Sequence, residues 1–376
     1  MNGRAARVNA YTRSMVPLAR RLLFRNRGGF LVTVAGVAAT VSLLLFLFAV
    51  HAGVRDGSTR YVRTAGVDIW IAQKGSDNII KSSSFVPASL AGRVAGIDGV
   101  AAASPLVRVI SKGEIRGRHT STLFLFGFDP ATRLGAPNDM TLKPGEIVLD
   151  ESFARKYQLR IGDSLTIQRR AFRIAGLSQG TNALLSQFGF VRFEDGAAIL
   201  GIQDTASFIL VKTRGDRAAV ARRIREAVPD VAVHEADDFT RYHDEELDSG
   251  VLPVFFGLAA FGAAVGGLIV ALMLYSSALE RRDDYATLKA LGAGQRYLLR
   301  LVVGQSLLVT MAGCIAGILF MCAITPLLLR AIPTLVLLYL PRHALIFPAA
   351  LAIGALAAIA PLRVLRRIYP GEVFRA

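Results

Sequence analysis

Residues 28–54 read GGFLVTVAGVAATVSLLLFLFAVHAGV, a stretch without a single Asp, Glu, Lys or Arg. A helix needs about 20 predominantly apolar residues to cross the hydrocarbon core of a bilayer. The same absence of charge recurs in residues 249–279, 301–329 and 344–362. The sequence therefore predicts four membrane-spanning helices. We place them at residues 28–54, 251–278, 298–329 and 344–362.

Each charge-free stretch has an alternative interpretation. Val50, His51 and Ala52 loosely imitate a signal-peptide cleavage site, but the apolar region of a signal peptide is only about 7–15 residues long. The other three stretches could be buried helices of a large soluble protein. Their length and the positive mean hydropathy of the chain, +0.44, favour membrane spans because core helices have shorter apolar runs.

Basic residues orient the predicted spans. They concentrate in the N-terminal segment (1–27), in the segment between the second and third spans (279–297) and in the tail (363–376), where few acids oppose them. Positive charge beside a span marks its cytoplasmic end. We therefore expect both termini in the cytoplasm, and residues 55–250 and the short loop 330–343 outside. The basic residues are Arg4, Arg7, Arg13, Arg20, Arg21, Arg25, Arg27, Arg281, Arg282, Lys289, Arg296, Arg300, Arg363, Arg366, Arg367 and Arg375.

The net charge of +16 indicates anionic lipid headgroups as a partner, and not nucleic acid, because the basic residues flank spans and do not line one soluble face. The N-terminal arginines alternate with apolar residues, which predicts an amphipathic helix on the inner membrane surface. A merely basic flank is the alternative. The alternating residues are Leu18, Arg20, Arg21, Leu22, Leu23, Phe24, Arg25 and Arg27.

Residues 55–250 are polar and long enough to bury a core of their own. Short strand-like stretches alternate there with helical periodicity at 152–157 and 217–228, which predicts an α+β domain. The expected fold class is a membrane protein with four transmembrane α-helices and a large α+β extracytoplasmic domain between the first and second. Strands are expected at 67–72, 123–128, 146–149, 164–168, 171–175, 190–192 and 208–212.

Motifs for catalysis are missing from the sequence. There is no G-x-x-x-x-G-K-[ST], H-E-x-x-H, C-x-x-C or G-x-S-x-G. One cluster contains metal-ligand residue types, but its spacing fits no standard site, and a solvated helix face is the simpler interpretation. The sequence predicts a chain without a catalytic, metal or cofactor site. The cluster consists of His234, Glu235, Asp237, Asp238, His243, Asp244, Glu245 and Glu246.

The two cysteines, Cys314 and Cys322, lie eight residues apart inside the third span, where small apolar packing is a simpler role than a disulfide. Charged residues are absent from the stretches 28–54, 249–279, 301–329 and 344–362, which argues against an ion pathway and favours an apolar or amphipathic cargo. The second span contains glycines at spacings that allow close helix contact across a dimer, or within one subunit. These dimer-face candidates are Gly257, Gly262, Gly266 and Gly267.

The segment 279–297 has the most specific pattern. A charged beginning is followed by a short amphipathic helix with Tyr285, Leu288 and Leu291 on one side, and Gly292 and Gly294 end it. Such a helix on the cytoplasmic side would present a compact, protruding surface to another protein. An ordinary solvated loop is the alternative, although loops of this length are uncommon without a role.

Three stretches resemble a known family. The run ERRDDYATLKALGA at 280–293 resembles the cytoplasmic signature of FtsX/MacB-type ABC transporter permeases, and the tail APLRVLRRIYPGEVFR at 360–375 is similar to the closing pattern of the same family. GEIVLDESFARKYQLRIGDSL at 145–165, followed by FRIAG at 172–176, resembles the periplasmic core of MacB-like permeases.

This resemblance implies partners that composition alone does not. It implies an ABC ATPase acting in trans, which binds the ATP; a second permease copy or paralogue, paired through the first and second spans; and a periplasmic adaptor protein. The segment between the second and third spans would be the coupling helix seated in the ATPase. The expected coupling residues are Arg282, Asp283, Tyr285, Leu288, Lys289, Leu291 and Gly292.

The expected function is therefore that of a permease subunit in a bacterial cytoplasmic membrane. ATP hydrolysis in the partner would move the extracytoplasmic domain and export a lipid, lipoprotein, peptide, antibiotic or haem, a mode called mechanotransmission. An FtsX-like signalling subunit that regulates a cell-wall hydrolase is the alternative, and a stand-alone sensor would need no ATPase.

Overall fold

The computed structural model describes residues 27–79, 83–117, 119–137, 140–183, 186–202, 204–250, 252–280, 282–290, 293–359 and 361. The chain divides into two compact units. The helical unit contains the residues up to Ala49, Val254–Leu327 and the residues from Tyr339 onward, and the sheet unit contains Val50–Pro253 and Leu328–Leu338. The expected N-terminal amphipathic helix and the basic tail lie outside the described residues.

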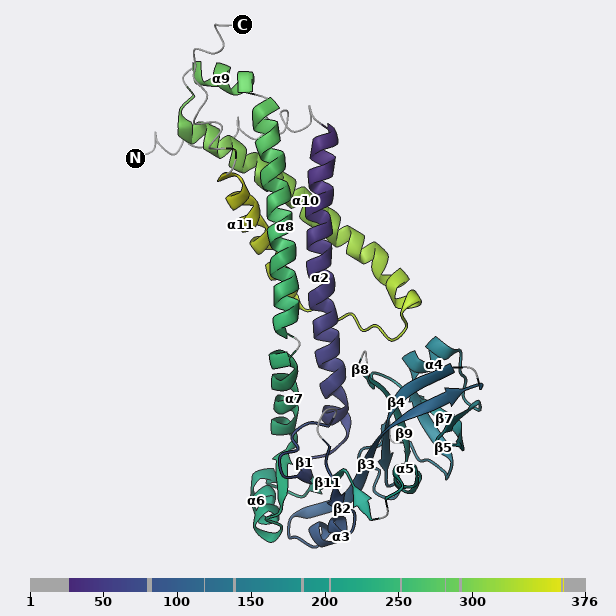
Figure 1. The fold of residues 1–376 in the computed structure, drawn as a ribbon. Coiled ribbons are helices and arrows are strands. Elements are labelled where there is room, and N and C mark those ends of the chain that lie inside the picture. Colours follow the sequence, from purple (N-terminus) through teal and green to yellow (C-terminus); the bar gives the residue numbers. More distant parts are fainter. Residues whose placement is uncertain are drawn as a thin grey trace. The chain divides into compact units, whose positions relative to one another are not determined.

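Three helices of the described part are long and apolar enough to cross a membrane: α2 (Arg27–Thr64), α8 (Leu252–Glu280) and α10 (Gln295–Ala331) (Figure 1). Helices α2 and α10 contain the charge-free stretches 28–54 and 301–329, and α8 contains residues 252–279 of the stretch 249–279. The short α9 (Arg282–Ala290) connects α8 and α10. A 3-10 turn, η2 (Pro341–Leu345), leads into α11 (Ile346–Ala357).

Helix α2 is longer than predicted. It does not end at residue 54 but continues to Thr64, for a length of about 57 Å at 1.5 Å per residue, nearly twice the ~30 Å hydrocarbon core. Its last turns are polar, and Asp56 pairs there with Arg60 and, at 3.1 Å, with Arg63. Such pairs within a helix stabilise it in water. The loss of apolar character at residue 54 therefore marks a change of surroundings and not the end of the helix.

The fourth predicted span, residues 344–362, is described only in part. The 12 residues of α11 rise only about 18 Å, and the residues after Pro361 lie outside the described part. Within the described residues, three helices reach spanning length and α11 does not.

The described residues of the sheet unit form twelve strands and five shorter helices in addition to the end of α2. The strands are β1 (Ile69–Gln73), β2 (Val86–Pro87), β3 (Val100–Ile115), β4 (His119–Phe128), β5 (Glu146–Asp150), β6 (Ser164–Ile167), β7 (Arg170–Ser178), β8 (Asn182–Ala183), β9 (Ser186–Arg192), β10 (Thr205–Ala206), β11 (Phe208–Thr213) and β12 (Val231–Glu235). The helices are α3 (Leu90–Ala95), α4 (Glu151–Tyr157), α5 (Phe193–Leu200), α6 (Arg217–Ala227) and α7 (Ala236–Gly250).

The main sheet is mixed and partly closed. Its strand order is β12-β1-β11-β3-β4-β9-β5-β7-β6. Because β6 also pairs with β3, the strands β3, β4, β9, β5, β7 and β6 form a closed ring. The β4–β9 and β5–β7 pairs are parallel, and the other pairs are antiparallel. The expected α+β domain is confirmed, and each of the seven expected strands overlaps an observed one.

Strand β1 separates two hydrophobic cores. Because side chains alternate along a strand, Ile69 and Ile71 join a cluster with Ile224 of α6. Trp70 joins the opposite cluster and stacks on Phe239 of α7, with ring centroids 5.0 Å apart.

Tyr61, near the end of α2, belongs to the same aromatic core as Trp70. Its hydroxyl donates to the carbonyl of Gly135 at 3.0 Å, and burial raises the pKa of this hydroxyl well above its ordinary value. The polar extension of α2 is thus fixed to the sheet by a buried tyrosine.

Candidate functional site

Helix α9 is the short helix that connects α8 and α10. It begins two residues after the end of α8 and ends at Ala290, just before the glycines expected to stop it. The backbone N–H of Ala293 donates to the carbonyl of Leu288 at 2.9 Å, the hydrogen bond that closes a helix in a Schellman motif. The segment is therefore an ordered helix and not an extended loop.

One face of α9 is buried within the chain. Tyr285 is 2% exposed and Ala286 is 1% exposed, and both belong to a cluster with Ala278 of α8 and with Leu298 and Leu301 of α10. A side chain buried in this way holds the helix in place and has little surface left for another protein. Among the expected coupling residues, Tyr285 is thus part of the support of the segment.

The other expected coupling residues lie differently. Leu288 packs at the margin of the same cluster, and Lys289 is half-buried. The outward surface belongs to Thr287 and Ala290, which the sequence did not single out. Leu291 and Gly292 lie outside the described residues. The backbone of Arg282 and Asp283 is helical, and their side chains are outside the described part.

Exposed basic residues follow α9 directly. Arg296 and Arg300 lie exposed in the first turns of α10, a short distance after Lys289 in the sequence. The described residues of this region present a short helix followed by exposed cations, which suits docking to a protein or to anionic headgroups.

The four glycines of α8 do not share one outward face. A Cβ built on Gly266 would lie 2.6 Å from the hydroxyl of Thr40 in α2, and one on Gly267 would lie 2.9 Å from Ile353 in α11. These two glycines allow close packing within the chain. A Cβ on Gly262 would contact Leu43 at 3.6 Å, and only Gly257 has open space around it.

The acidic and histidine cluster is divided between β12 and α7. His243 is buried; its Nε2 accepts from the backbone N–H of Ile79 at 2.8 Å, and its Nδ1 lies 2.8 Å from the carbonyl of Phe239. Burial lowers the pKa of His234. Among the described residues, no three His, Cys, Asp or Glu side chains are grouped to hold a metal ion.

One acid of this cluster, Asp244, and the nearby Asp248 instead connect α7 to α2 inside the sheet unit. Arg55 pairs with Asp244 at 3.0 Å and with Asp248 at 3.5 Å. Sequence reasoning missed this contact. The only trace of it is that Asp244 and Asp248 lie four residues apart and so share a helix face.

Two family descriptions match the chain. Residues 30–227 match the MacB-like periplasmic core domain, and residues 256–370 match the FtsX-like permease C-terminal region.

The chain is also similar to curated and solved proteins. An uncharacterized ABC transporter permease of Mycobacterium tuberculosis H37Rv is 24% identical over 364 residues, covering 94% of this chain and 97% of that protein. Another, from Mycobacterium bovis, is 24% identical over 348 residues, covering 91% of this chain and 94% of that protein. The crystal structure of the periplasmic region of MacB from Actinobacillus actinomycetemcomitans has a TM-score of 0.38 and 14% identity, covering 47% of this chain and 94% of that chain.

Proposed function

The chain belongs to the ABC transporter permeases that combine a MacB-like periplasmic core domain with an FtsX-like permease region, and on this premise we propose that it couples a separate ATPase to its extracytoplasmic domain. ATP hydrolysis in the partner displaces α9, and the displacement moves the domain that exports an amphipathic or hydrophobic compound. The absence of charged residues from the three long apolar stretches supports such a cargo.

One observation carries this proposal: α9 is buried on the face toward α8 and α10 and exposed on the opposite face. Tyr285 and Ala286 are buried against the end of α8 and the start of α10, so a force on α9 acts on both long helices. Thr287 and Ala290 remain exposed for a partner. Packed elements of this kind shift as units, because close-packed interiors deform little.

A bulky residue on the exposed face tests the docking. Ala290→Trp leaves the buried face of α9 intact and places an indole in the expected interface. We expect the amount of ATPase chain that co-purifies from the native membrane to fall about tenfold, which corresponds to about 1.4 kcal/mol.

The matched control is Ala331→Trp, at the opposite end of α10, where the alanine is also exposed. This variant should retain the ATPase. Equal retention by both variants, or no ATPase with the unaltered chain, would overturn the proposal.

We further propose that α9 is cytoplasmic, together with both termini, and that residues 344–362 complete a fourth span. The cations Lys289, Arg296 and Arg300 near α9 support this orientation. In a chain with Cys322→Ala, a membrane-impermeant maleimide should label Lys74→Cys in the sheet unit of intact cells. It should label Thr287→Cys only after permeabilisation. Labelling of Thr287→Cys in intact cells would reverse the orientation.

A dimer along α8 is part of the same proposal. Large apolar side chains are exposed on α8 at alternating spacings of three and four residues, the repeat with which helices pair along a seam. Gly257 flanks this stripe, whereas Gly266 faces Thr40. The stripe consists of Val254, Leu258, Phe261, Val265, Leu268, Leu272, Tyr275 and Leu279.

Cysteine cross-linking separates the two faces of α8. In a background without the native cysteines, Phe261→Cys should form a disulfide between two copies under oxidation, and Gly266→Cys should not. A stripe that faces only lipid would give no cross-link at either position, and the dimer along α8 would then be rejected.

A further inference from the structure

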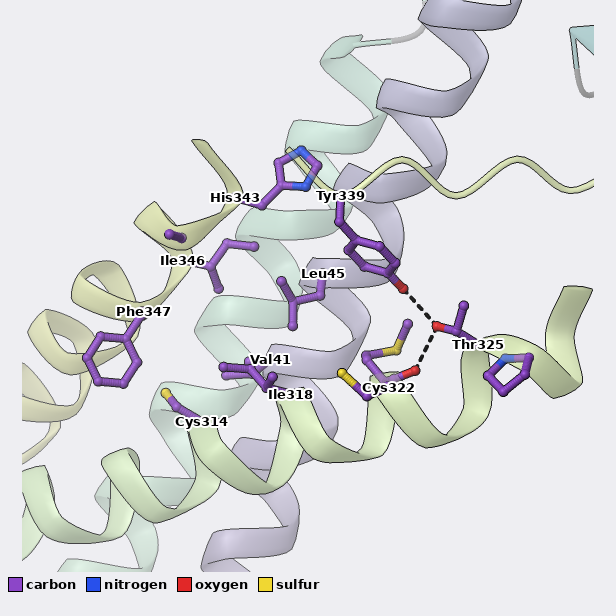
Figure 2. Close-up of a pocket in the computed structure, with 13 residues that line it drawn as sticks. Val41, Leu45, Cys314, Ile318, Cys322, Thr325, Tyr339, His343, Ile346 and Phe347 are labelled. Carbon is purple, nitrogen blue, oxygen red and sulfur yellow. Dashed lines mark hydrogen bonds between the residues drawn. The ribbon is translucent and has the colours of Figure 1, made fainter. Parts of the chain in front are cut away.

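A cavity of about 470 Å³ lies within the helical unit, lined by α2, α10 and the segment that leads into α11. Figure 2 shows Val41 and Leu45 of α2, Cys314 and Ile318 of α10, and Phe347 of α11 around it. Its volume is in the range of ~300–1,000 Å³ that is typical of ligand sites. The coupling segment and the sheet unit do not contribute to it.

The cavity follows from how α2 and α10 cross (Figure 1). The two helices touch at glycines: a Cβ on Gly313 would lie 2.5 Å from Val37, and one on Gly317 would lie 2.8 Å from the carbonyl oxygen of Ala38. The hydroxyl of Ser42 lies at the crossing and shares its proton between the carbonyl of Ala38 at 2.6 Å and the carbonyl of Gly317 at 3.1 Å. Beyond it, larger side chains face each other, and the residues from Tyr339 to Phe347 cover the space that remains.

The lining suits a hydrocarbon chain. Among the described residues, no Asp, Glu, Lys or Arg lines the cavity, and its lining includes the buried His343. The hydroxyl of Thr325 donates to the carbonyl of Met321 at 2.7 Å, so in the 2.9 Å contact between Thr325 and Tyr339 the tyrosine hydroxyl is the donor. These hydroxyls are satisfied by the protein, and an ion or a charged headgroup would find no carboxylate, ammonium or guanidinium group among the described lining residues.

The cavity opens sideways. Ile318 is 43% exposed, Phe347 is 37% exposed and Cys322 is exposed, although all three line the cavity. The medium beside an apolar spanning helix is the acyl-chain region of the bilayer. A molecule that enters from this side comes from the acyl-chain region of the bilayer, where phospholipid chains are the main component.

The length and polarity of the cavity fit one leaflet. From Cys314 to Thr325, α10 rises about 16 Å, close to the ~15 Å that is half of the hydrocarbon core. Tyr339, at the Thr325 end, is 45% exposed, and tyrosines of membrane proteins concentrate where headgroups begin. The hydroxyl of Tyr339 keeps acceptor capacity for a headgroup N–H or O–H.

We propose that this cavity binds one acyl chain of a bilayer phospholipid, with the headgroup beside Tyr339 and the chain end near Cys314. The site is separate from the coupling of ATP hydrolysis, because it lies among α2, α10 and α11 and needs no partner protein.

The full-length protein in nanodiscs made with a phospholipid that carries a photoactivatable diazirine on one acyl chain provides the test. After illumination, mass spectrometry should locate cross-links at Ile318, Cys322 and Phe347. Ile318→Trp fills the opening and should reduce the cross-links at Cys322 and Phe347 about tenfold, which corresponds to about 1.4 kcal/mol. Leu319→Trp changes a neighbouring outward residue, 64% exposed, that does not line the cavity, and it should leave them unchanged.

Cross-links spread evenly over outward residues such as Leu319 and Leu327, and equally affected by both variants, would mean that only annular lipid is present and would overturn the proposal. Free fatty acid carrying the same diazirine, added to nanodiscs of unlabelled lipid, distinguishes the source: preferential cross-linking by the fatty acid would reject the phospholipid. If Ile318→Trp does not fold, Cys322→Phe, which also reduces the opening, replaces it. Loss of ATPase binding in Ala290→Trp leaves these cross-links intact, so the two proposals fail separately.

Discussion

The sheet unit and the helical unit of this one chain pack in opposite ways. The largest fully buried side chains all belong to the sheet unit and include Trp70, Phe208 and Phe239. In the helical unit, helices approach each other closely at glycines, as at Gly313 and Gly317, because glycine has no side chain to keep the backbones apart.

The difference has a physical cause in the solvent of each unit. Burial of large apolar side chains stabilises a domain in water because water excludes them. Between helices in a bilayer this driving force is absent, since lipid tails are as apolar as the side chains, and close van der Waals contact takes its place. Substitutions should therefore act through lost volume in the sheet unit and through added volume in the helical unit.

The largest effect should come from a cavity in the sheet unit. Phe239→Ala removes the ring stacked on Trp70 and should lower the free energy of unfolding by about 3–5 kcal/mol. Trp70 is the single tryptophan of the chain, so its fluorescence during urea unfolding reports on this unit. Phe85→Ala, at a position 51% exposed, should have almost no effect; equal losses for both variants would contradict a core built on ring volume.

The second effect should come from volume added in the helical unit. Gly317→Leu forces α10 away from α2 and should cost about 1–3 kcal/mol. Buried Cys314 provides the probe: in a Cys322→Ser background and in detergent, it should react with a thiol-specific dye at a lower temperature. Gly304→Leu on the same helix, where an added Cβ meets no atom within 4 Å, should leave this temperature unchanged. A similar shift for both variants would show that glycine contacts do not hold the helical unit.

A smaller, pH-dependent effect is expected at Asp68. Burial would raise the pKa of this carboxyl, but hydrogen bonds from the Thr213 N–H (2.9 Å) and the Lys212 amine (3.0 Å) outweigh it and lower the pKa below its ordinary value of 3.8. The ionised form thus stabilises the fold above about pH 4, and this contribution is lost as the pH falls through the lowered pKa.

Asp68→Asn should therefore cost about 1 kcal/mol at neutral pH, and the difference from the unaltered chain should shrink in acid. Unfolding curves followed by Trp70 fluorescence measure both. A loss that stays constant with pH would assign the effect to packing and not to the charge of Asp68.

The smallest effect should come from the ion pair between Arg55 and Asp244, a 3.0 Å contact of partly exposed side chains. Arg55→Gln should cost at most about 1 kcal/mol. At about 1 M salt, where the Debye screening length falls to ~3 Å, most of the difference in unfolding free energy should disappear. Arg223→Gln, which breaks the 2.9 Å surface pair with Asp98, should give a similarly small, salt-sensitive loss. A large, salt-independent loss of unfolding free energy for Arg55→Gln would contradict this expectation. It would mean that the pair stabilises the contact between α2 and α7 more than partly exposed ion pairs do.

Much of the fold could be predicted from local pattern. Apolar runs without charge located α2, α8 and α10, and alternation located the seven expected strands, because both signals are periodic along the sequence. Strand β3 was missed: its first residues, VAAASP, are poor in β-branched side chains and contain Pro105, which reads as a break. It forms a strand because β4, β6 and β11 pair with it.

The candidate site was predictable only in outline. The amphipathic pattern located α9, but it assigned Tyr285 to a surface for a partner, whereas the structure buries this side chain against α8 and α10. An apolar residue on a short helix can face its own chain or another protein, and its spacing is the same in both cases.

By itself, the sequence determined where the chain enters an apolar medium, where it forms an α+β domain, and where a short helix joins two long ones, because composition and period act over neighbouring residues. The tertiary structure alone decided the closed ring of strands, the contact of Arg55 with α7, the intrachain role of Gly266, and the cavity beyond the crossing of α2 and α10. These features depend on which residues meet from distant parts of the chain, and steric fit between distant segments leaves no periodic trace along the sequence.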